Sequence, residues 1–161
     1  MAVFSILLAA GGCSYMGVEH PAMSGAENAE ELGVYSGFTP TEIVILPLTH
    51  IFGTDGAKET SGIEAYVSMT DRFGNQIKSP ALFRFELYEK IQRSSEPKGV
   101  RAVIWPDMDL RDPVGNNRYW QDFLRAYKFN LNFKPLKDQN YVLQVTCFSP
   151  AGRRLSAEYG L

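Results

Sequence analysis

The sequence predicts an all-β domain, an antiparallel β-sandwich of about seven strands. Three observations predict it. Apolar and polar residues alternate with a period of two along most of the second half of the chain. Turn-forming Gly, Pro, Asn and Asp separate these runs. Aromatic residues make up 12% of the 161 residues, including 10 Phe and 8 Tyr, as suits packed strands. A chain of this length forms one domain of ordinary size.

Seven runs carry the strand pattern. The clearest is 127–133, where Tyr127, Phe129, Leu131 and Phe133 alternate with Lys and Asn. A slip of one residue in the strand register would point all four apolar side chains toward solvent, so the register is well specified. This alternation of apolar and polar residues predicts sheets with one solvent-exposed face. Two such sheets must therefore pack together through their apolar faces. The first run is apolar without alternation, which predicts a strand covered on both faces. The predicted strands are 42–48, 63–70, 82–90, 100–105, 127–133, 141–148 and 154–159.

Two turns and one ambiguous segment complete the domain. The turns at 71–75 and 149–152 place Gly or Asn where a positive φ is needed. The Asp-x-x-Gly-Asn turn at 71–75 resembles turns of bacterial immunoglobulin-like and transthyretin-like modules, which implies a sandwich of one of these forms. Residues 119–124 fit either a helical turn that closes one end of the sandwich or an irregular edge strand.

The amino terminus predicts an export signal. Residues 2–10 are apolar but too short to cross a bilayer, and small residues follow them. The ending Leu-Ala-Ala-Gly-Gly-Cys at 8–13 resembles the lipobox of bacterial lipoproteins. That resemblance implies removal of residues 1–12 and acylation of Cys13, which would anchor the protein in a membrane. Ser14 follows, where Asp would favour retention in the inner membrane, so the outer membrane is the expected location.

This pattern departs from the lipobox in two ways. Ala10 stands where the family prefers Leu, and no Lys or Arg precedes Cys13. A basic stretch upstream of Met1 would explain the second departure. An ordinary cleaved signal peptide and an apolar first strand remain alternatives. Residues 13–39, rich in Gly, Ala, Ser, Glu and Asn, predict a lipidated N-terminus with a flexible tether to a domain at 40–161.

The chain as a whole is similar to small lipoproteins of planctomycete-type bacteria. The likeness lies in the lipobox and spacer and in three later motifs. It implies no known activity. The later motifs are Ile-Leu-Pro-Leu at 45–48, Glu-Leu-Tyr at 86–88, and Trp120 before Tyr-x-Phe-x-Leu at 127–131.

Catalytic chemistry finds little support in this sequence. The 2 His, His20 and His50, lie apart, and no Gly-x-Ser-x-Gly turn or Gly-rich phosphate loop occurs. We therefore expect neither an enzyme nor a resident metal or cofactor. The net charge of −2, without a basic stripe, disfavours nucleic acid. Cys147 fits a small buried residue of a strand, although a disulfide with Cys13 is a second interpretation.

Two weak site signals remain. Asp107, Asp109 and Asp112 crowd one loop and could bind calcium, although the spacing is not that of an EF-hand. Trp105 and Trp120, with Tyr residues, could form an aromatic platform for sugar or peptide, although sandwich cores often bury Trp. The sequence thus predicts a membrane-anchored, non-catalytic scaffold or adaptor for an envelope protein. The alternative is a module that binds carbohydrate or a ligand through calcium.

Overall fold

The computed structural model of the protein describes residues 39–53, 61–136 and 138–161. This part of the chain contains ten strands and one short helix. No helix in it is long and apolar enough to cross a membrane. In chain order the elements are β1 Glu42–Ile45, β2 His50–Phe52, β3 Gly62–Thr70, β4 Leu82–Lys90, β5 Lys98–Ile104, β6 Met108–Asp109, α2 Pro113–Tyr119, β7 Trp120–Gln121, β8 Ala126–Asn132, β9 Tyr141–Phe148 and β10 Arg154–Gly160.

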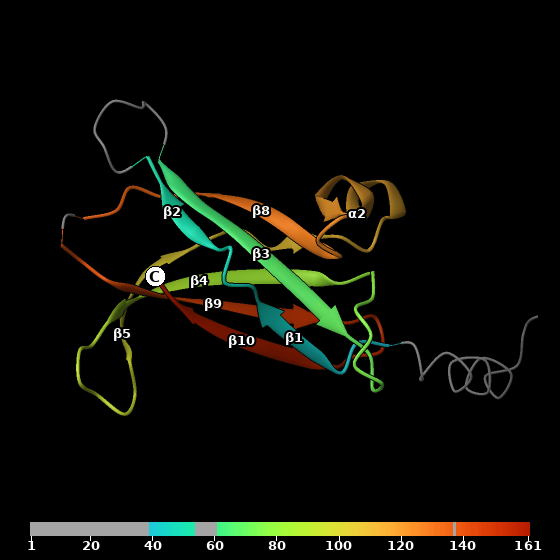
Figure 1. Ribbon diagram of the computed structural model, residues 1–161, viewed down its shortest axis with the longest axis horizontal. Helices are drawn as coiled ribbons and strands as arrows, with labels where there is room; N and C mark the ends of the chain where they lie inside the picture. The colour runs from blue at the N-terminus through green and yellow to red at the C-terminus, as the bar shows by residue number, and fades with distance from the viewer. Residues whose placement is uncertain (1–38, 54–60, 137) are drawn as a thin grey trace, which may run out of the picture.

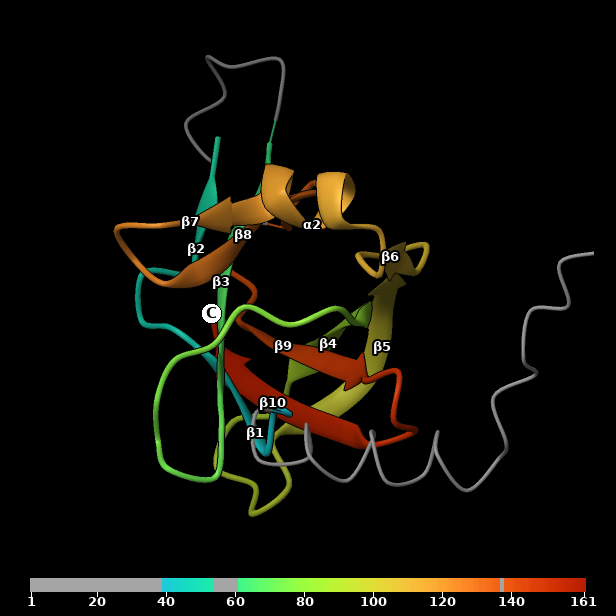
Figure 2. The ribbon, with the colours of Figure 1, turned by 90° about the vertical axis from the view of Figure 1, so that its right-hand side faces the viewer.

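The strands form two antiparallel sheets that pack face to face, which confirms the predicted sandwich (Figure 1). Sheet A has the order β1-β3-β8-β7, and β2 also pairs with β3. Sheet B has the order β10-β9-β4-β5, and β6 also pairs with β4. On one side of the sandwich β1 lies beside β10. On the other side α2 and β6 lie between the sheet edges (Figure 2).

The alternating residues identified in the sequence form the core. In β8, Tyr127, Phe129 and Leu131 are at most 1% exposed. Phe129 contacts the ring of Phe85 from sheet B, with 4.7 Å between ring centroids. Cys147 is also fully buried, and its Sγ lies 3.8 Å from the Met69 sulfur. Such contacts across the two sheets bury nearly all of the apolar period-two residues and fix the register.

The first predicted strand is wrong in extent and in burial. β1 ends at Ile45, and after Pro47 the chain resumes as β2, so that both pair with β3. The break is a turn around Pro47, in which the Leu46 carbonyl accepts the N–H of Thr49 at 3.0 Å. The N–H of Tyr66 in β3 donates to Thr49 Oγ1 at 2.9 Å. Val44 is 38% exposed, so β1 is covered on one face only. Short strands such as β2, β6 and β7 raise the count from about seven to ten.

The ambiguous segment at 119–124 contains an edge strand, β7, and the helix lies before it. Asp112 Oδ2 accepts the N–H of Gly115 at 2.7 Å and caps α2, with Pro113 in the first turn. Buried Asn116 donates to the carbonyl oxygens of Ser79 and Leu110 at 3.1 and 2.8 Å. The loop predicted around Asp112 is therefore in part a helix held against the sandwich.

Candidate functional site

The candidate site is a groove on the side of the sandwich opposite β1 and β10. It has a cavity volume of about 420 Å³. It lies where the edge of β8 in sheet A faces β6 in sheet B. We call it the seam groove; it is lined by Met108, Arg118, Tyr119, Gln121, Lys128 and Asn130.

The edge of β8 is open along this groove. β7 pairs only with Tyr127 and Ala126, so the strand has no neighbour on that side beyond Tyr127. The N–H of Phe133 donates to the Ser61 carbonyl at 3.2 Å, which sets the direction of the alternate main-chain groups. The N–H and C=O of Asn130 therefore point away from β3 and into the groove. They form an unpaired stretch of sheet edge.

Trp105 marks one end of this open edge. Its Nε1–H donates to the Asn132 carbonyl at 2.9 Å and so bridges the two sheets. At the other end Tyr119, the last residue of α2, packs its ring 5.2 Å from that of Phe129. Between them, the main-chain N–H and C=O of Asn130 are open to a partner segment.

The groove is cationic. Lys128 Nζ pairs with Glu64 Oε1 at 3.0 Å, and the hydrogen bond from Lys128 lowers the pKa of Glu64. Arg118, by contrast, forms no ion pair with any carboxylate of the described residues. No Asp or Glu lines the cavity. The groove thus presents one uncompensated guanidinium beside open main-chain donors and acceptors.

The two tryptophans do not form one platform. Trp105 contacts Phe133 near the end of β8, with 6.5 Å between ring centroids. Trp120 packs edge-on against Tyr127, at the beginning of the same strand, at 5.0 Å. Five residues of extended chain separate Tyr127 from Asn132, which is about 17 Å. Both tryptophans are partly buried against the core.

The three aspartates of the predicted calcium loop each bind a different partner. Arg84 Nη2 lies 2.7 Å from Asp107 Oδ2, and the hydrogen bond from Arg84 lowers the pKa of Asp107. Hydrogen bonds from Arg111 lower the pKa of Asp109 to about 2. Asp112, as described, caps α2. Within residues 39–53, 61–136 and 138–161, no group of three or more His, Cys, Asp or Glu is arranged to hold a metal ion.

The remaining residues singled out in the sequence lie apart from the groove. His50 is exposed on β2, where its Nδ1 lies 2.9 Å from the Leu48 carbonyl oxygen. Cys147 is a free thiol, and burial raises its pKa to about 11, so it is a poor nucleophile. Cys13 and His20 lie outside the described residues.

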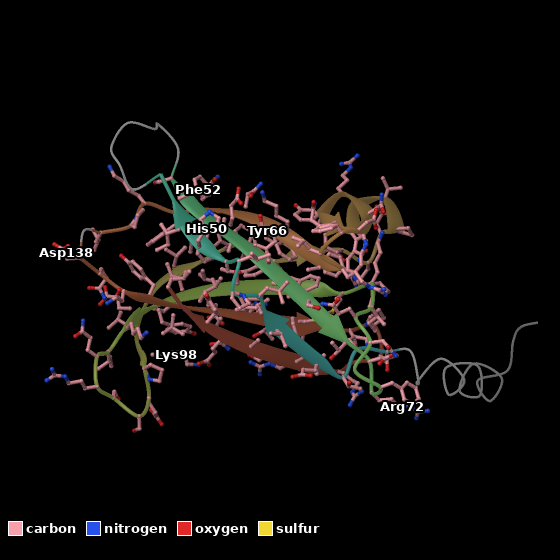
Figure 3. All side chains as sticks on the ribbon, in the orientation of Figure 1. His50, Phe52, Tyr66, Arg72, Lys98 and Asp138 are labelled. Carbon is pink, nitrogen blue, oxygen red and sulfur yellow. The ribbon has the colours of Figure 1, made fainter. Side chains whose placement is uncertain are left out.

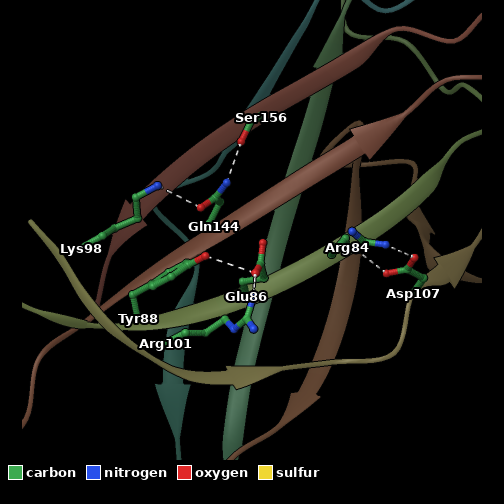
Figure 4. A network of polar contacts seen from close by, with 8 residues as sticks. All are labelled: Arg84, Glu86, Tyr88, Lys98, Arg101, Asp107, Gln144 and Ser156. Carbon is green, nitrogen blue, oxygen red and sulfur yellow. Dashed lines mark hydrogen bonds and ion pairs between the residues drawn. The ribbon is translucent and has the colours of Figure 1, made fainter. Parts of the chain in front are cut away.

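The outer face of sheet B carries a ladder of polar side chains from all four long strands (Figure 4). Glu86 Oε1 accepts from the Tyr88 hydroxyl at 3.2 Å and from Arg101 at 2.7 Å. Lys98 donates to Gln144 at 3.0 Å. Cross-strand pairs of this kind stabilise a wet sheet face. Because these groups bind one another, we assign this face a structural role rather than a contact role.

Sequence reasoning missed the seam groove. One signal was present for its helical end, since Asp112-Pro113 is a common helix start. No sequence signal identifies the open edge, which depends on which strands become neighbours. The chain matches no family model, no curated protein and no solved structure. The groove is therefore interpreted from its own geometry.

Proposed function

We propose that this protein is a non-catalytic adaptor of the bacterial cell envelope. Acyl groups on Cys13 hold it on a membrane, with the outer membrane expected, and the sandwich binds another envelope protein. Several acyl chains anchor a protein far more firmly than one. The lipobox-like residues 8–13 and the spacer composition of 13–39 support the anchored part of the proposal.

One observation carries the adaptor role: the open main-chain edge of β8 at Asn130, set in the seam groove. An extended segment of a partner can add to such an edge, with hydrogen bonds from its main chain and specificity from alternate side chains. The added segment would cover Met108, which is half-buried on the facing sheet. Arg118 favours a partner segment with a carboxylate at the matching position.

A comparison of Asn130→Pro with Asn130→Ala tests the binding mode. Proline removes the outward N–H without removing a hydrogen bond to β3, whereas alanine keeps the main chain intact. Each variant is used to recover partners from detergent-solubilised native membranes. We expect one partner to be recovered with the wild type and with Asn130→Ala, and at least tenfold less of it with Asn130→Pro. Equal recovery with both variants would contradict strand addition.

The anchor is tested separately. A Cys13→Ser variant should lose labelling by radioactive fatty acid and move from the membrane fraction to the soluble fraction. Retention of both the label and the membrane location would contradict acylation at this residue. Because this test does not involve β8, the two parts of the proposal can fail independently.

A further inference from the structure

Three connections meet at one end of the sandwich, which we call the loop end: residues 71–81, 122–125 and 149–153. Leu82 pairs with Phe148, which places 71–81 beside 149–153. Arg125 donates to the Gln76 carbonyl at 3.0 Å, which joins 122–125 to 71–81. This end faces the viewer in Figure 2.

Two aromatic side chains project from the loop end. Phe73 is 66% exposed and Phe123 is 97% exposed. The first is displayed by a tight turn, in which Asp71 Oδ1 accepts the N–H groups of Phe73 and Asn75 at 2.8 and 2.9 Å. The second lies in the turn that joins β7 to β8, where the N–H of Arg125 donates to the Asp122 carbonyl at 3.3 Å. Both rings are therefore held in solvent by hydrogen-bonded turns.

The loop end is also cationic. Four basic side chains lie on it, and none is paired with a carboxylate of the described residues. Two acidic residues lie on the same connections, of which Asp71 is only 6% exposed and Asp122 is exposed. The guanidinium of one arginine lies 4.7 Å from the Phe73 ring, as close as a cation–π contact requires. The four are Arg72 (Figure 3), Lys78, Arg125 and Arg153.

The described chain begins at this same end. The N–H of Thr41 donates to the carbonyl of Thr70, the residue before the 71–75 turn, at 2.8 Å. Everything that precedes Thr39, including Cys13, is thus joined to the sandwich at the loop end. The amino-terminal segment therefore enters the domain beside the connection that carries Phe73.

We infer that the loop end docks on the surface of an anionic lipid bilayer, with Phe73 and Phe123 inserted among the headgroups. Aromatic rings favour this interfacial layer, and basic side chains are attracted to anionic lipid. Docking at this end leaves the seam groove on the flank of the domain, where it follows β8 away from the bilayer and stays open to a partner. The inference goes beyond the adaptor proposal, since it requires neither acylation of Cys13 nor binding at β8.

The test uses the full chain carrying Cys13→Ser, so that no acyl group contributes, and vesicles that contain phosphatidylglycerol. We expect Phe73→Ser and Phe123→Ser each to lower the partition coefficient about tenfold, which corresponds to about 1.4 kcal/mol. Leu136→Ser is the matched control, because Leu136 is 67% exposed but lies near Asp138 at the opposite end (Figure 3). It should change the coefficient less than about twofold. An equal effect of all three substitutions would overturn the inference.

A second measurement decides the matter even if residues 1–12 alone hold every variant on the vesicles. A fluorophore is placed at Ala151→Cys, in the 149–153 turn, or at Leu136→Cys. Cys147 is buried and escapes labelling. Spin-labelled lipid should quench the label at 151 strongly and that at 136 weakly. Equal quenching at both positions would overturn the docked orientation. Neither readout involves β8, so failure here leaves the adaptor proposal intact.

Discussion

Removal of a single oxygen atom should loosen the wall of the seam groove. The Tyr127 hydroxyl is fully buried and accepts the N–H of Ser79 at 2.9 Å. It also lies 2.9 Å from the Ser79 carbonyl oxygen and 3.2 Å from Oδ1 of Asn116 in α2. The Tyr127→Phe substitution removes these contacts and leaves the N–H of Ser79 without a partner. The helix that forms one end of the groove then loses part of its attachment.

The magnitude follows from two contributions. A lost hydrogen bond reduces stability by about 1 kcal/mol, and an unpaired buried donor adds about 1 kcal/mol or more. We therefore expect the free energy of unfolding to fall by about 2 kcal/mol. With a urea m-value of about 2 kcal/mol per molar, the unfolding midpoint should move down by about 1 M.

Equilibrium urea unfolding monitored by tryptophan fluorescence provides the assay. Tyr88→Phe is the matched control, because the Tyr88 hydroxyl donates to Glu86 on the wet face of sheet B. Its loss should change the free energy of unfolding by about 0.5 kcal/mol or less. If Tyr127→Phe changes stability no more than Tyr88→Phe does, the buried hydrogen bonds do not hold α2 as we describe.

Three further predictions concern single positions. Gly62→Ala should lower the free energy of unfolding by about 1–3 kcal/mol in urea titrations, because its Cβ would lie 2.5 Å from the Leu131 carbonyl oxygen; an unchanged midpoint would contradict this close approach. Asp112→Ala should lower it by about 1 kcal/mol through loss of the helix cap, and Asp112→Asn should restore most of it. Lys128 lowers the pKa of Glu64, so the stabilisation from this pair is present above the unfolded-state pKa of about 4.3 and is lost as the pH falls further. Between about pH 6 and pH 3, the wild type should lose more stability than Glu64→Gln, and equal losses would contradict the pairing.

Much of the fold could be predicted from local pattern alone. Strands β3, β8 and β9 bury the period-two apolar residues, and the predicted bounds of β8 are displaced by one residue from those observed, Ala126–Asn132. These predictions succeeded because burial on one face of a pleated strand leaves a trace in every second residue. The first strand was mispredicted because apolar content alone does not distinguish a doubly covered strand from an edge strand. Pro47 within the run was the better signal, since proline favours edges and breaks.

The candidate site could not be predicted, for a physical reason. An open sheet edge is a property of strand neighbours, and nothing within residues 126–132 states that β7 covers only the first two of them. The same holds for the aspartates at 107, 109 and 112. Their spacing suggested shared ligation, but pairing with arginines on β4 and in the same loop separates them. Side-chain chemistry was visible in the sequence, whereas the choice of partner was set by the tertiary structure.

Amide hydrogen exchange at Asn130 tests the central claim most directly. In the free protein its N–H points away from β3 into the groove, so it should exchange rapidly, whereas the N–H groups of Phe129 and Leu131 are paired with β3 and should exchange slowly. In the complex with the partner recovered from native membranes, the Asn130 amide should become protected. An Asn130 amide that exchanges slowly in the free protein, or that stays unprotected in the complex, would contradict the open edge and its proposed use.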